Sequence, residues 1–230
     1  MKRFYEVASA VPVEDGWALT LDGREVKTPA HARLRLPNAA LANAAAAEWS
    51  RQGKVLKPLT MPLTGFAYAA VDRIAPDPQG FAATLSRFVE SELLCYRADG
   101  PVPLVRRQSE EWDPLLGWAA ARYDISFIVT SGVIHKPQAV ATLARVGAAY
   151  AAFNSFQLAA LHPVVTICGS AIIGLAVAEN HLDADQAFAA GQLDELWQAE
   201  QWGTDPLALA SLAERRAALD NAIDLLRLLA

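Results

Sequence analysis

Residues 15–36 read DGWALTLDGREVKTPAHARLRL, and this stretch predicts a small antiparallel β-sheet near the start of the chain. Asp15-Gly16 and Asp22-Gly23 are dipeptides that favour tight hairpin turns. Between them Trp17, Leu19 and Leu21 alternate with Ala or Thr, which is the period of a strand with one apolar face. Strands this short need helices against their apolar face to be stable.

From Asn38 onward the apolar residues follow the period of an α-helix. Pro37-Asn38 starts an Ala-rich helix, and the Asp-Pro dipeptides at Asp77, Asp113 and Asp205 each predict the start of another. The sequence predicts helices near residues 39–52, 62–75, 78–96, 104–123, 137–161, 163–180, 184–202 and 206–229.

One interruption of the helical pattern bears on the domain organisation. Residues 125–134, ISFIVTSGVI, are rich in β-branched side chains at alternating positions, and we expect this strand to return to the N-terminal sheet. The predicted fold class is α+β. A small N-terminal antiparallel β-sheet domain with a helix, residues 1–57, precedes a larger α-helical bundle domain, residues 58–230.

Residues 158–178, LAALHPVVTICGSAIIGLAVA, are as long and apolar as a membrane span. His162-Pro163 divides the stretch, and it lacks flanking Lys/Arg clusters and aromatic belts. The sequence therefore favours a fully buried central helix and no membrane insertion.

The composition excludes several classes of protein. Hydrophobic residues make up 53% of the 230 residues, which favours a large core over disorder. The net charge is −5, and residues 138–230 hold four Lys/Arg against ten Asp/Glu, so a basic footprint for nucleic acid is missing.

Cys95 and Cys168 lie in no metal or redox motif, which favours a reducing compartment. The N-terminal residues resemble neither a secretory signal nor a transit peptide, so we expect a bacterial cytoplasmic or a mature form.

Motifs for catalysis are missing from the sequence. It contains no phosphate-binding loop, dinucleotide fingerprint or nucleophile elbow, and its histidines lack metal-ligand spacing. Carboxylates such as Asp194, Glu195 and Glu200 leave open an alternative, a carboxylate-dependent enzyme of unknown substrate. Glu195 and Glu200 fall about 140° apart around a helix, so one helix alone does not bring them together. We expect no catalytic residues, no cofactor and no metal.

The most specific pattern lies in residues 93–118, LLCYRADGPVPLVRRQSEEWDPLLGW. Gln108, Trp112, Leu115 and Leu116 share one face of a helical period. Asp113 can act as a cap and Pro114 can take a first helical position, so a break or kink at this point is tolerable. Together with Tyr96-Arg97, this pattern resembles the assembly chaperones of mitochondria and alphaproteobacteria that bind the alpha subunit of the ATP synthase catalytic head.

Further motifs resemble the same family in the same order along the chain. They are Glu48-Trp49, Met61-Pro62-Leu63-Thr64 leading to Asp72, and Glu195 to Glu200 followed by Trp202-Gly203. The resemblance implies a molecular chaperone that holds the unassembled alpha subunit until the beta subunit replaces it, without ATP hydrolysis. It also implies the mitochondrial matrix as the location of eukaryotic relatives.

These motifs divide into two groups of candidate residues. We expect the first group to be structural: Trp49, Asp72, Gln108, Trp112, Asp113 and Pro114. We expect the second group to bind the partner: Asp194, Glu195, Trp197, Glu200 and Trp202. Aromatic anchors among charged residues are typical of protein interfaces, and we expect Glu200 to be the most sensitive carboxylate. The protein is expected to be a monomer.

Overall fold

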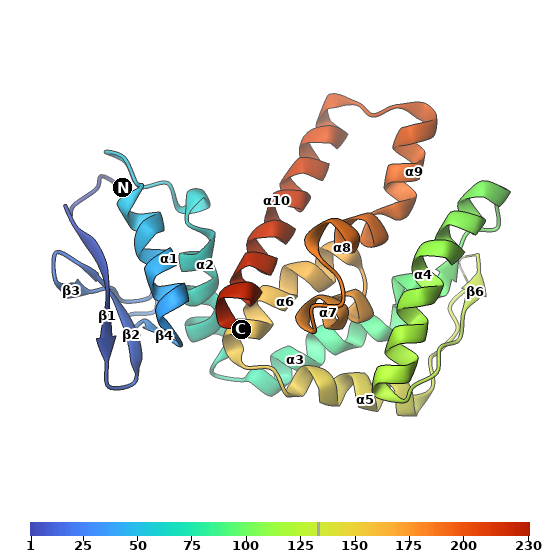
Figure 1. Cartoon of the computed structure of the whole chain (residues 1–230), viewed down its shortest axis with the longest axis horizontal. Coiled ribbons are helices and arrows are strands. Elements are labelled where there is room, and N and C mark those ends of the chain that lie inside the picture. Colours follow the sequence, from blue (N-terminus) through green and yellow to red (C-terminus); the bar gives the residue numbers. More distant parts are fainter. Residues whose placement is uncertain (133) are drawn as a thin grey trace. The chain divides into compact units, whose positions relative to one another are not determined.

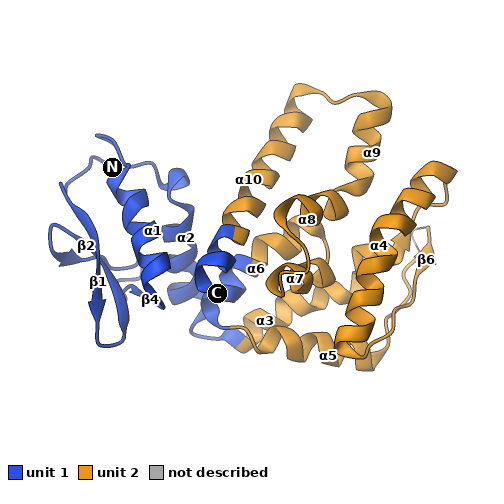
Figure 2. Ribbon diagram, in the orientation of Figure 1, with its two compact units in different colours: residues 1–78, 154–160, 224–230 blue, residues 79–153, 161–223 orange. Residues whose placement is uncertain are grey.

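The computed structural model describes residues 1–132 and 134–230 (Figure 1). Those residues form a small antiparallel sheet near the N-terminus and a helical remainder, which confirms the predicted α+β class. The chain divides into two compact units (Figure 2). Unit 1 comprises residues 1–78, 154–160 and 224–230, and unit 2 comprises residues 79–153 and 161–223. The first of these units ends later than residue 57, where the sequence predicts the domain boundary, and it includes two later segments.

The strands are β1 (Ala8–Val13), β2 (Gly16–Leu21), β3 (Arg24–Glu25), β4 (Arg35–Leu36), β5 (Tyr96–Arg97) and β6 (Thr130–Ser131). The α-helices are α1 (Ala39–Ser50), α2 (Pro62–Ala69), α3 (Pro78–Ser86), α4 (Val102–Tyr123), α5 (Val140–Ala151), α6 (Ser155–Cys168), α7 (Ala171–Ala178), α8 (Ala184–Gly191), α9 (Leu193–Trp202) and α10 (Pro206–Leu229). Short 3₁₀ helices cover Pro58–Thr60, Arg87–Ser91 and Leu93–Cys95, and a π-helical turn covers Ala70–Ile74.

Strand β2 is the centre of the sheet in unit 1. Its alternating sequence predicts one apolar face, but Ala18 and Thr20 are buried as well as Leu19 and Leu21, so both faces of the strand are covered. It pairs antiparallel with β1 over six positions, and with β3 and β4 at its two ends. The turn between β2 and β3 has a positive φ at both Asp22 (49°) and Gly23 (78°), as a tight two-residue hairpin requires. At the other end of β2, a Cβ on Gly16 would lie 2.7 Å from the carbonyl oxygen of Leu36, so only glycine fits there.

Helix α1 packs on β1 and β2 through its alanine-rich face. Asn38 caps the helix, because its side chain accepts a hydrogen bond from the backbone nitrogen of Leu41 at 2.9 Å. Ala42 and Ala45 are buried, and their small side chains let the helix approach the sheet closely. The core of unit 1 includes Leu19, Leu21, Leu34, Leu36, Leu41, Trp49, Ala160 and Leu225.

Glu48 joins α1 to α2 from inside unit 1. Its side chain is 2% exposed, and its carboxylate accepts hydrogen bonds from the backbone nitrogens of Leu63 (2.7 Å) and Thr64 (2.9 Å). The hydroxyl of Thr64 donates a third at 2.7 Å. A buried carboxylate needs such partners, and the first amides of a helix supply them. The Glu48-Trp49 and Met61-to-Thr64 motifs thus meet at the start of α2.

Unit 2 is built around α7. Residues 171–177 are all buried, and α4, α5 and α8 contact this helix (Figure 1). The apolar stretch at residues 158–178, expected to form a fully buried helix, is buried for the most part, but His162 and Thr166 are exposed. It is also divided, because the chain turns at Gly169 and Ser170 starts α7 by accepting a hydrogen bond from the backbone nitrogen of Ile173. Within the described part of the chain, no helix is both long and apolar enough to cross a membrane.

The structure corrects the strand expected at residues 125–134. Among the described residues of this range, 125–132 and 134, the one strand is β6, and it pairs parallel with β5 of unit 2 instead of joining the N-terminal sheet. The side-chain amide of Gln138 takes the place of a strand partner upstream, because it donates to the carbonyl of Ile128 and accepts from its backbone nitrogen, each at 2.9 Å. Val133 lies outside the described residues.

Three long predicted helices are shorter in the structure. The helix expected at residues 137–161 is broken before Asn154, whose side chain caps α6 by accepting hydrogen bonds from two backbone nitrogens at 3.0 Å. The helix expected at residues 184–202 is broken at Gln192 into α8 and α9. The helix expected at residues 78–96 ends at Ser86 and continues as 3₁₀ turns.

Candidate partner-binding site

Helix α9 carries all five residues expected to bind a partner, and the start of α10 runs in the opposite direction in unit 2 (Figure 1). Helix α9 ends at Gly203, whose φ is 79°. Asp205 starts α10, because its carboxylate accepts hydrogen bonds from the backbone nitrogens of Leu207 (2.8 Å) and Ala208 (3.0 Å). We refer to residues 194–212 as the α9–α10 corner.

Two of the expected partner-binding acids form ion pairs within the unit. Both carboxylate oxygens of Glu200 accept hydrogen bonds from Arg107 of α4, at 2.9 and 2.7 Å. Glu195 accepts one from Arg215 of α10 at 2.6 Å. The sequence suggested an acidic face, whereas the structure shows a rim of mixed charge. Such exposed pairs contribute at most about 1 kcal/mol each, so they orient side chains more than they stabilise the fold.

Asp194 and Gln108 connect the corner to the 93–118 motif. The Gln108 side chain is 1% exposed, donates to Asp194 at 2.8 Å and accepts from the backbone nitrogen of Ala98 at 2.9 Å. The backbone oxygen of Gln108 accepts a hydrogen bond from Arg97 at 2.7 Å. Because the nitrogen and the oxygen of this buried amide are both hydrogen-bonded, they favour a single arrangement of the chain around it.

Trp112, Asp113 and Pro114 belong to the uninterrupted helix α4. Trp112 is fully buried, and its indole nitrogen donates to the carbonyl of Ala190 at 2.9 Å. Arg97 lies over its ring at 5.2 Å and donates to Asp113 at 2.6 Å. The helix start expected at Asp113 is therefore wrong, because α4 begins at Val102 and contains Pro114 in its interior. A proline there costs about 3 kcal/mol, which the buried side chains on either side offset.

Trp49 and Asp72 hold separate parts of unit 1 together. The indole nitrogen of buried Trp49 donates to the hydroxyl of Thr64 at 3.1 Å. Asp72 accepts hydrogen bonds from the hydroxyl of Thr28 (2.6 Å) and the backbone nitrogen of Ala30 (3.0 Å). The structural role expected for both residues stays a prediction.

The α9–α10 corner exposes apolar side chains that a folded chain ordinarily covers. Trp202 is 79% exposed, Leu207 83% and Leu209 52%. Beside them lies a depression of about 240 Å³ lined by residues of both helices, including Glu195, Trp202 and Leu212. Trp197 is half-buried on the same helix. An exposed apolar cluster with a charged rim is the arrangement found at protein interfaces.

The carboxyl group whose pKa is most strongly shifted is that of Glu92, which lies outside the α9–α10 corner. Glu92 is completely buried, and burial raises its pKa to about 7 despite hydrogen bonds from the backbone nitrogens of Leu94 and Ile172. A group so enclosed cannot meet a substrate. Asp194 and Glu195 are partly exposed and Glu200 is exposed, but each is held by an arginine or an amide, so they do not combine with Glu92 into an acid–base pair.

Sequence reasoning missed the cations and leucines of this site. Arg107 and Arg215 each stand in an Arg-Arg doublet, which was the visible signal, but the pairing of Arg107 with Glu200 spans 93 positions. Leu207 and Leu209 look like ordinary apolar positions of a helix, because the period of a sequence does not show which face remains uncovered.

Comparisons with known proteins agree on one family. Residues 2–120 match the family described as ATP12 chaperone protein. The structure of Atp12 from Paracoccus denitrificans is 42% identical with a TM-score of 0.95, over 99% of this chain and 97% of that chain. The Atu1473 protein from Agrobacterium tumefaciens is 39% identical with a TM-score of 0.95, over 100% of this chain and 86% of that chain. A mitochondrial atp12 protein of Schizosaccharomyces pombe is 26% identical over 216 residues, which are 88% of this chain and 74% of that protein.

Proposed function

Because the chain belongs to the ATP12 chaperone family, we propose that it binds the unassembled alpha subunit of the ATP synthase catalytic head and prevents its aggregation until the beta subunit replaces it. Membership of the family makes the chain a chaperone of ATP synthase assembly, not an enzyme. A subunit that awaits its neighbour exposes apolar surface and is prone to aggregate. Covering that surface reversibly requires no nucleotide. We propose that the chain does this as a monomer in the bacterial cytoplasm, since two similar structures come from bacteria.

The exposed apolar cluster of the α9–α10 corner is the observation that supports a client contact there. Trp202 is the proposed anchor, because a large aromatic side chain that is 79% exposed gains most from burial against a partner. Leu207 and Leu209 extend the apolar surface on α10.

The acids of the corner take a different role from the one that the charge count suggested. We propose that Glu195 and Glu200, with Asp194 behind them, place arginines at the rim and so present alternating charge to the client. Such a rim selects the partner and its orientation more than it raises affinity. Trp197 supports the rim from its half-buried position on α9.

Light scattering of denatured alpha subunit, diluted with and without this protein in the absence of nucleotide, tests the proposal. We expect the protein to suppress scattering at molar excess, and unchanged scattering would contradict the client assignment. Trp202→Ser should weaken suppression, while Val140→Ser should not, because Val140 is equally exposed in the same unit (80%) but lies on α5. Equal suppression by both variants would remove the corner from the site.

A further inference from the structure

Unit 1 contains a cavity of about 750 Å³ that neither the structural motifs nor the proposed client contact explains. Tyr5, Leu21, Val26 and Trp49 form its inner wall and are each less than a tenth exposed. Its volume and apolar, aromatic lining are those of a binding site and not of a packing defect. An open apolar hollow of this size raises the free energy of the unbound chain, which favours an occupant.

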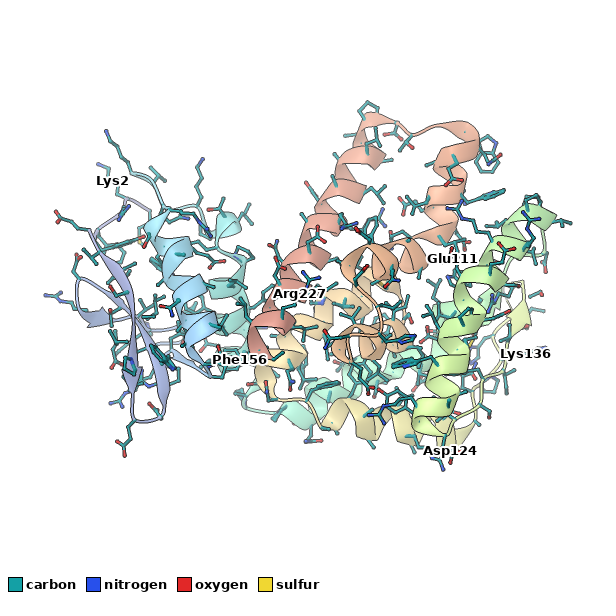
Figure 3. All side chains as sticks on the ribbon, viewed as in Figure 1. Lys2, Glu111, Asp124, Lys136, Phe156 and Arg227 are labelled. Carbon is teal, nitrogen blue, oxygen red and sulfur yellow. The ribbon has the colours of Figure 1, made fainter. Side chains whose placement is uncertain are left out.

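Exposed apolar side chains continue the cavity outward. Met1 (77% exposed) and Phe4 (64% exposed) line its mouth, and Val55 (54% exposed) lies beside them. A backbone bridge between Lys2 and Val55 holds the first residues against the chain that follows α1, so these side chains stay on the surface. Lys2 is labelled in Figure 3. The apolar surface thus extends beyond the cavity, which fits a polypeptide segment better than a small molecule.

The charged side chains at the mouth differ in whether they have a hydrogen-bond or ionic partner. The carboxylate of Asp22 accepts hydrogen bonds from two backbone nitrogens, and Glu25 is paired with Arg35 at 2.9 Å. The exposed side chains of Arg24 and Lys27 have no ionic or hydrogen-bond partner among residues 1–132 and 134–230. Arg24 and Lys27 are therefore the cations at the mouth that remain available to an acidic ligand.

We propose that this cavity is a second client-binding site, which takes one large apolar side chain of an extended peptide segment flanked by acidic residues. The inner wall buries the side chain, the exposed apolar mouth covers its neighbours, and Arg24 and Lys27 pair with the acids. The proposal rests on the chaperone function only in that the client supplies the segment. Two separate sites on one chain would raise the overall affinity for a client that reaches both.

Nuclear magnetic resonance titration of the full chain with short peptides tests the site without any alpha subunit. The probe is acetyl-Asp-Phe-Leu-Glu-amide, and the controls are acetyl-Lys-Phe-Leu-Lys-amide and acetyl-Asp-Ala-Ala-Glu-amide. We expect the probe to shift the resonances of residues 21–28 and to bind at least tenfold more tightly than either control. No shift there, or equal binding of the basic peptide, would overturn the proposal.

Charge-reversal variants separate this site from the proposed function. Arg24→Glu with Lys27→Glu should weaken probe binding at least tenfold and reduce suppression of alpha-subunit aggregation. The matched control is Arg51→Glu with Lys57→Glu, because both side chains are exposed in unit 1 and do not line the cavity. Phe4→Ser, a change at an exposed position, should also weaken binding of the probe peptide. In one outcome the parent chain suppresses aggregation while the cavity variant and its matched control show equal probe binding and equal suppression. That result would overturn the second site and leave the proposed function standing.

Discussion

Replacing Glu92 with Gln should abolish the contribution of this carboxyl group to the pH dependence of the stability of unit 2. The carboxyl group is fully buried, and its pKa is raised by burial from 4.5 to about 7. Between these two values the folded chain keeps the proton and the unfolded chain has released it. The free energy of unfolding therefore falls as the pH rises, by about 1.4 kcal/mol per pH unit. The whole loss is about 3 kcal/mol and is complete above pH 7.

The amide of Gln cannot ionise, so Glu92→Gln should lack this loss. Near pH 5 the variant should be less stable by about 1 kcal/mol, because the amide replaces one acceptor at the start of α7 by a donor. Near pH 8 it should be more stable than the parent by about 2 kcal/mol, since a buried charge has been removed. Urea melts at pH 5, 6, 7 and 8, followed by circular dichroism, measure both curves. Glu214→Gln, at an exposed acid, is the control. A difference between Glu92→Gln and the parent that stays constant with pH would refute the reasoning.

Features set by neighbouring residues were predictable from the sequence. The strand around Leu19, the cap at Asn38 and the Asp205-Pro206 start of α10 all depend on residues within a few positions, and the structure contains each of them. Pro114 was misread because its helix continues through contacts made elsewhere in unit 2. Buried Trp112, for example, is held by the carbonyl of Ala190 from α8. Local propensity carries no information about such a partner.

The prediction that residues 125–134 form a strand of the N-terminal sheet was wrong for a related reason. Its β-branched residues favour extended backbone, and the backbone there is held by the side chain of Gln138, so a sheet partner is replaced by an amide. The candidate site shows the same limit. The sequence placed Glu200 on a helix beside aromatic residues, but it did not show that Arg107 neutralises it. Charge sums describe composition, whereas the field at a surface depends on which charges pair.

Three further predictions follow from the same contacts. Glu48→Ala should lower the free energy of unfolding by about 3 kcal/mol, because it leaves two backbone nitrogens of α2 without an acceptor; a thermal melt like that of the parent would contradict this. Trp112→Ala should cost about 3–5 kcal/mol in the same assay, whereas Trp202→Ala should stay within about 0.5 kcal/mol. Glu200→Lys should fold but bind the client more weakly, because the new ammonium stands beside Arg107, and the loss should shrink as salt screens the repulsion. Adding Arg107→Glu to that variant recreates the ion pair with its charges exchanged, and client binding should recover. A double variant that melts like the parent and still binds as weakly as Glu200→Lys would show that Glu200 contacts the client directly.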